Sequence, residues 1–127
     1  MAIKRDSADK HFSLAVRERD KHLCRFCGGE GTDCAHIFGR RIKAVRWSMD
    51  NAICLCRYHH NYFGENPIHF HDFLKQILGQ DHLDSLRVKA AQVYKTNEKL
   101  RKEISKHYRE QLKIFYSDPS HQIESWN

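Results

Sequence analysis

Residues 24–60 decide the fold, and they read CRFCGGEGTDCAHIFGRRIKAVRWSMDNAICLCRYHH. A Cys-x2-Cys pair opens this stretch and a Cys-x2-His pair closes it, so two pairs of metal-binding side chains share one spacing. Both members of such a pair can reach the same ion, and the glycines after the first pair permit the tight turn that this requires. We therefore predict a structural, tetrahedral zinc site with no open position, formed by Cys24, Cys27, Cys56 and His59.

Two other cysteines compete for this role. Cys54 is out of phase with Cys56 along an extended strand, so only one of the two can point toward the ion. Cys34 is better suited to packing as a small apolar group. The chain has five cysteines in all, and its N-terminus lacks the apolar core of a secretory signal. We therefore expect an intracellular protein that uses its cysteines for metal binding and not for disulfides.

The charge of the chain favours a polyanionic partner. The formal net charge is +6 and the pI is about 9.2, and lysine and arginine side chains displace counterions from a nucleic-acid backbone. Between the two ligand pairs lies a basic run without an acid, for which we predict phosphate contacts; the alternative is a solvated basic loop. Charge alone would also allow a membrane surface, but no stretch reaches the roughly 18 apolar residues of a membrane span, so we expect a nucleic acid and no membrane as partner. The basic run comprises Arg40, Arg41, Lys43 and Arg46.

Apolar periodicity and turn residues predict a single domain of mixed structure. We expect an N-terminal helical segment over 1–20 with Ser7 as its N-cap, a zinc-bound core over 21–79, a helical extension over 80–117, and a tail over 118–127 that frays or is ordered only by crystal contacts. Within the core we expect a strand over 32–38, a second strand or turn over 47–55, and a helix that begins at Cys56. An apolar stripe on the last helix offers a surface for homodimer formation. The stripe consists of Leu100, Ile104, Tyr108, Leu112 and Phe115.

A second set of residues lies between the zinc ligands. His36 is followed by Asn51 and then by His60, directly after the closing Cys-x2-His pair. In this order and spacing the stretch resembles the HNH endonuclease family, whose active site is the ββα-metal motif, and it looks most like phage-encoded, NinG-like members. The resemblance implies an α+β fold: a small zinc-stapled ββα-metal core with an N-terminal helix and long C-terminal helices. It also implies the cytoplasm of a bacterial host as the location if the protein is phage-encoded.

By this resemblance the protein is a metal-dependent DNA endonuclease that nicks or cuts, with branched DNA among its candidate substrates. His36 is then the general base, because a neutral imidazole can take a proton from water. Asn51 holds that imidazole or stabilises the loop that does. His60 binds a catalytic Mg²⁺ or Mn²⁺ ion, unless it exchanges roles with His59.

The sequence departs from the family pattern at two positions. Many members carry a metal ligand just before the base and another four residues after the last histidine, where this chain has Ala35 and Gly64. The alternative reading is therefore a zinc-stapled DNA-binding protein with a degraded nuclease site. The candidate replacement ligands for the catalytic ion are Asp33, Asp50, Glu65 and His69.

Overall fold

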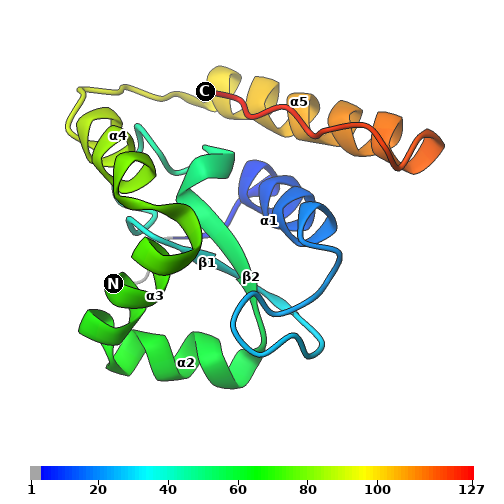
Figure 1. Cartoon of the computed structure of the whole chain (residues 1–127). Helices are drawn as coiled ribbons and strands as arrows, with labels where there is room; N and C mark the ends of the chain where they lie inside the picture. The colour runs from blue at the N-terminus through cyan, green and yellow to red at the C-terminus, as the bar shows by residue number, and fades with distance from the viewer. Residues whose placement is uncertain (1–3) are drawn as a thin grey trace.

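The computed structural model describes residues 4–127 and shows an α+β fold, which confirms the predicted class. Two short strands lie at the centre, and helices cover both sides (Figure 1). The helix expected at the N-terminus begins at Ser7, but its N-cap is Asp6, whose side chain accepts from the Asp9 backbone N–H. The elements are α1 (Ser7–Arg19), β1 (Asp33–His36), a 3-10 turn (Met49–Asn51), β2 (Ala52–Leu55), α2 (Arg57–Glu65), α3 (Pro67–Leu78), α4 (Gln80–Ala90) and α5 (Glu98–Ser117).

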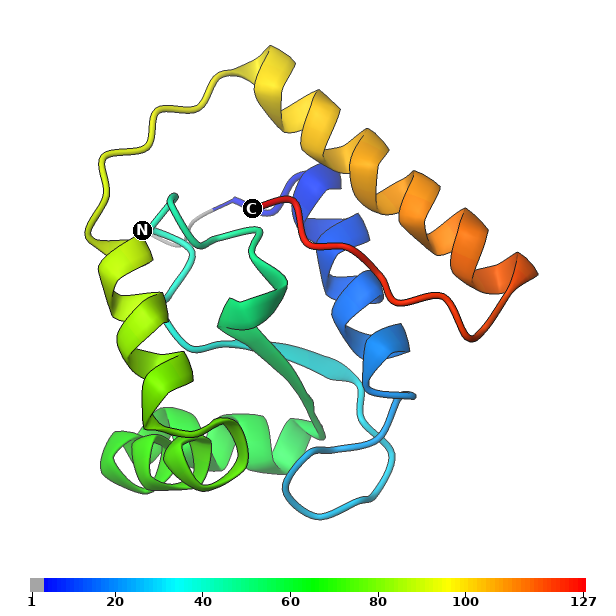
Figure 2. The same ribbon diagram turned by 45° about the horizontal axis from the view of Figure 1, so that its top comes forward.

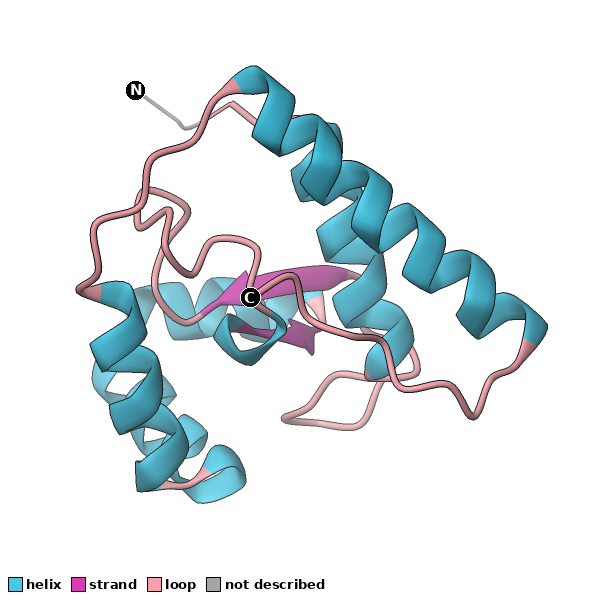
Figure 3. Cartoon of the chain, turned by 90° about the horizontal axis from the view of Figure 1, so that it is seen from above, coloured by secondary structure: helices cyan, strands magenta, loops and turns pink. Residues whose placement is uncertain are grey.

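The two strands pair in antiparallel register, and their side chains alternate between two apolar clusters. Cys34 and His36 point to the side of α1, where the His36 ring lies 5.5 Å from that of Phe12. Asp33 and Ala35 occupy the alternate positions, and Ala35 packs in the cluster shared with α2, α3 and α4. The small sheet is therefore the middle layer between two groups of helices (Figure 3).

Helix α5 lies against α1, and its apolar stripe forms part of the core. Ile104, Tyr108 and Leu112 are buried, and the Tyr108 hydroxyl donates to the backbone carbonyl of Trp47. An apolar face that is buried within one chain is not available to a second copy. The stripe predicted to serve self-association is thus used inside the fold.

The last ten residues are ordered along α5, so the expectation of a frayed tail was wrong (Figure 2). The Trp126 backbone N–H donates to the Tyr108 hydroxyl at 2.9 Å, and the Asn127 side chain donates to the Ala44 carbonyl at 2.8 Å. The hydroxyl of Ser125 accepts from the Met49 N–H at 2.9 Å. These contacts attach the tail to α5 and to residues 44–49, which lead into β2.

Membrane insertion finds no support in the helices that the structure describes. Over residues 4–127, none of them combines the length and the apolar character that crossing a bilayer would need.

Candidate metal centre and active site

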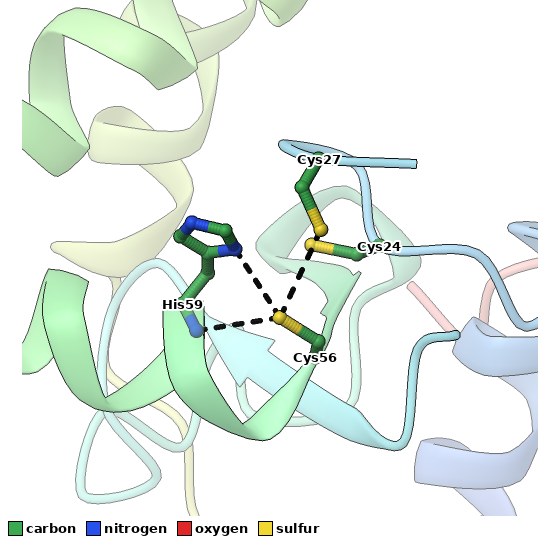
Figure 4. Close-up of side chains that lie close together, drawn as sticks. All are labelled: Cys24, Cys27, Cys56 and His59. Carbon is green, nitrogen blue, oxygen red and sulfur yellow. Dashed lines mark hydrogen bonds between the residues drawn. The ribbon is translucent and has the colours of Figure 1, made fainter. Parts of the chain in front are cut away.

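The four predicted zinc ligands converge at one point (Figure 4). The ligand atoms of Cys24, Cys27, Cys56 and His59 all lie within 4.8 Å of one another. The Cys27 and Cys56 sulfurs are 4.0 Å apart, and the Cys56 sulfur is 3.2 Å from His59 Nδ1. Three thiols and one imidazole are the donor set of a structural zinc site, so the residues fit the ion. It is the only group of three or more such side chains among residues 4–127.

Local backbone structure places these ligands. The turn after Cys24 closes with hydrogen bonds between Cys24 and residues 28 and 29, and Gly28 adopts a left-handed φ of +74° that favours glycine. On the other side, Cys56 is the N-cap of α2, and its sulfur accepts from the His59 N–H at 3.4 Å. Because the first turn of α2 carries both Cys56 and His59, helix formation brings this pair together.

The other cysteines are unsuited to bind the ion. Burial raises the pKa of Cys34 to about 12 and that of Cys54 to about 11, so both remain neutral thiols. For Cys24 burial acts in the same direction, but backbone N–H groups directed at its sulfur outweigh it and lower the pKa. Burial raises the pKa of the ligand Cys56 as well, so it is the convergence of the four ligand atoms that separates the ligands from Cys34 and Cys54.

His36 lies at the end of β1 with one ring nitrogen engaged. Its Nε2 is 3.1 Å from the Arg46 carbonyl, which can only accept, so Nε2 carries the proton and Nδ1 keeps its lone pair. Burial lowers the pKa of His36 to about 4, against the opposing effects of this hydrogen bond and of Asp9. The imidazole is therefore neutral at pH 7, in one defined tautomer.

Asn51 is fully buried and contacts the loop after His36. Its side-chain oxygen accepts from the Phe38 N–H at 2.8 Å, and its side-chain nitrogen donates to the Phe38 carbonyl at 2.9 Å. The Asn51 carbonyl also accepts from the Ile37 N–H. Of the two roles considered for Asn51, this geometry matches the second: it fixes the backbone that follows the histidine.

His60, in the first turn of α2, contacts a carboxylate on β1. Its Nδ1 is 2.8 Å from Asp33 Oδ2, which also accepts from Arg57 Nε at 2.8 Å. Burial of Asp33 opposes its ionisation, but hydrogen bonds from His60, Arg57 and Thr32 hold its pKa below the usual value. A carboxylate on one ring nitrogen orients a histidine so that the other nitrogen can bind a metal. Asp33 is thus the one replacement candidate with a described contact to His60 among residues 4–127.

His36 and His60 line the same cleft, which has a volume of about 630 Å³. Its walls also carry Asp9 and Asp33, and arginines from four segments of the chain. Arg40 was expected there, whereas the others were not, since they lie outside the basic run and only the packing of α1 and α2 brings them in. The cleft arginines are Arg5, Arg17, Arg40 and Arg57.

The remaining members of the basic run lie elsewhere. Arg46 is only 6% exposed and makes two hydrogen bonds to Asp9, at 3.0 and 2.6 Å. Its guanidinium is buried against the Asp9 carboxylate of α1, and this position does not fit the predicted contact with a phosphate. Arg41 and Lys43 are exposed in the loop after β1 and do not line the cleft.

A comparison with known proteins agrees with this geometry. Residues 24–71 match a family model described as HNH endonuclease. No curated protein and no solved structure matches the chain. The closer likeness to phage-encoded, NinG-like members remains a prediction. The matched region contains the zinc ligands, His36, Asn51 and His60, and the match supports the HNH endonuclease family and a nuclease-type function for this part of the chain.

Proposed function

We propose that the protein is a metal-dependent DNA endonuclease that hydrolyses phosphodiester bonds, nicking or cutting. The observation that supports it best is the cleft, in which a neutral imidazole of fixed tautomer and a carboxylate-backed imidazole meet among four arginines. Fixed positive charge around a general base is what hydrolysis of a polyanion requires.

In this proposal His36 takes the proton of the attacking water at Nδ1. The low pKa keeps the imidazole in its base form at neutral pH. When the proton arrives, the Arg46 carbonyl and the Asp9 carboxylate stabilise the imidazolium, because both favour the charged ring. Asn51 keeps the loop after His36 in place through its paired hydrogen bonds to Phe38.

His60 would hold a divalent ion, Mg²⁺ or Mn²⁺, through Nε2, while Asp33 accepts a hydrogen bond from Nδ1–H. Such an ion supplies charge neutralisation at the scissile phosphate and the leaving 3′ oxygen. Water and substrate oxygens would complete the coordination, since Ala35 and Gly64 offer no ligand. Arg17, Arg40 and Arg57 would hold neighbouring phosphates.

Plasmid nicking tests the proposal. Supercoiled plasmid is incubated with zinc-loaded protein in Mg²⁺ or Mn²⁺, beside His36→Ala and the matched control His71→Ala, an exposed histidine of α3. We expect nicking by the wild type and by His71→Ala, and a loss of at least about 100-fold in His36→Ala, the lower end of what a general base contributes. Equal nicking by all three proteins would refute the proposal.

One observation favours a second candidate, a zinc-stapled DNA-binding protein with a degraded nuclease site. Among residues 4–127 no group of three metal-binding side chains surrounds His60. This candidate predicts that the wild type binds DNA with strong salt dependence yet nicks no plasmid in either ion. Gel-shift measurements at two salt concentrations, run on the same preparations, separate the two functions.

A further inference from the structure

A second pocket shares the two histidines with the cleft. It has a volume of about 600 Å³, and His36, His60 and Asn61 line both it and the arginine-lined cleft. The two spaces therefore meet at the groups to which the proposed function assigns the chemistry. We call this second space the apolar pocket; its other walls are Ala35, Ile37, Leu55, Phe63, Gly64, Glu65, Pro67 and Phe70.

The two spaces differ in chemistry. The cleft carries four arginines, whereas the apolar pocket has no lysine or arginine among its walls, and Glu65 is its only acid. Phe70 is half-buried in α3, with its ring 5.0 Å from that of Phe63. A phosphate would be repelled by Glu65 and find no lysine or arginine there, while the apolar faces of a planar base would meet aromatic and aliphatic walls.

Two small residues contribute to the wall of the pocket. Ala35 on β1 and Gly64 on α2 both line it. A Cβ added to Gly64 would meet no heavy atom within 4 Å, and the residue lies in a regular helix without a left-handed φ. The space beside Gly64 is therefore open, and a larger side chain at this position could enter it without backbone strain.

We propose that the apolar pocket receives an unpaired base of the DNA strand being cut, with its backbone held in the arginine-lined cleft. This inference rests on the proposed nuclease function and names its substrate class: DNA with an unpaired nucleotide next to the scissile phosphate. In a duplex that base is stacked and paired, and extracting it costs a few kcal/mol. In a bubble, flap or single strand the base is already unstacked. The pocket would therefore favour DNA with an unpaired base over fully paired duplex.

The test compares cleavage of two labelled oligonucleotides that share the strand to be cut, one fully paired and one with a central unpaired bubble. We expect kcat/KM to be at least about tenfold higher for the bubble, as the contribution of one base–aromatic contact suggests. Phe70→Ala, which removes a wall, and Gly64→Leu, which fills the space, should both reduce this ratio toward one. Phe115→Ala, a half-buried phenylalanine of α5 remote from the pocket, is the matched control and should keep it.

A binding measurement keeps the inference testable if one variant folds poorly. A bubble carrying 2-aminopurine beside the mapped cut is titrated with the wild type without Mg²⁺ or Mn²⁺, and its fluorescence should change on binding but not when the Gly64→Leu protein is used instead. If the wild type cuts duplex and bubble equally and an abasic analogue at that position is cut as well as the base, the pocket does not bind a base, although the nuclease function stands. If no DNA is cut in any divalent ion, the nuclease function itself fails.

Discussion

At the scale of the residue, one carbonyl fixes the tautomer of His36 and burial fixes its charge. The Arg46 carbonyl accepts the Nε2 proton and burial keeps the ring neutral. We predict that NMR of the His36 ring shows the Nε2–H tautomer at pH 7 and no titration until the pH falls to about 4. In the unfolded chain the His36 ring takes up its proton near pH 6.5, the ordinary value for histidine. Between these values the unfolded state binds the extra proton, so stability falls as the pH is lowered. A midpoint near 6.5 in the folded protein would contradict this placement.

Asp33 gives a second prediction at this scale. Asp33→Asn weakens the acceptor that orients His60, so we expect the Mg²⁺ or Mn²⁺ concentration for half-maximal nicking to rise between about 10-fold and 100-fold, as for other outer-shell partners of metal-binding histidines. Asp72→Asn, an exposed acid of α3, is the control. An unchanged ion requirement in Asp33→Asn would show that the contact has no part in ion binding.

At the scale of the element, the zinc site joins the turn after α1 to the start of α2. We predict that Cys24→Ser loses both bound zinc and cooperative folding, because binding contributes about 10 kcal/mol of apparent folding energy. Cys34→Ser alters a half-buried neutral thiol outside the site and should keep its zinc. Metal content and thermal unfolding are measured together. A folded Cys24→Ser protein with a full complement of zinc would refute the assignment.

Helix α1 and the loop before β2 are joined by a buried ion pair. Arg46 and Asp9 have side chains 7% and 4% exposed. Removing one partner leaves an unpaired buried charge, so Asp9→Asn should lower the free energy of unfolding by about 3 kcal/mol or more. Glu110→Gln, in an exposed pair with Lys106, should cost less than about 1 kcal/mol. Denaturant titrations check both; similar small losses would mean that the buried pair carries little stability.

At the scale of the whole molecule, the tail attaches the last helix to the loop that carries the Arg46 carbonyl. Deleting residues 118–127 removes the hydrogen bonds to Ala44 and Met49. We expect kcat for nicking to fall severalfold while zinc content and DNA affinity stay close to those of the full chain. If kcat is unchanged, the loop is held in place without the tail.

Sequence reasoning succeeded where spacing is local and failed where packing decides. The zinc ligands could be found because each pair lies within one turn of the chain. The ion pair between Arg46 and Asp9 could not be predicted, because the two residues lie 37 positions apart. Nothing in the basic run distinguishes Arg46 from its neighbours. Arg5 and Arg17 were missed for the same reason: only the docking of α1 brings them to His36. The ordered tail depends on Tyr108 and Trp126 meeting across a chain reversal, which leaves no periodic signal.

The attachment of the tail also bears on synthesis in the cell. Ribosomes make the chain from its N-terminus, so residues 24–60 emerge long before Ser125 and Asn127 can bind the loop that positions His36. The zinc site needs no residue beyond His59 and can close early. A nascent chain can therefore form its zinc site before the loop that contacts His36 is held in place. If the proposed function holds, full nuclease activity would follow only after residues 118–127 have left the ribosome.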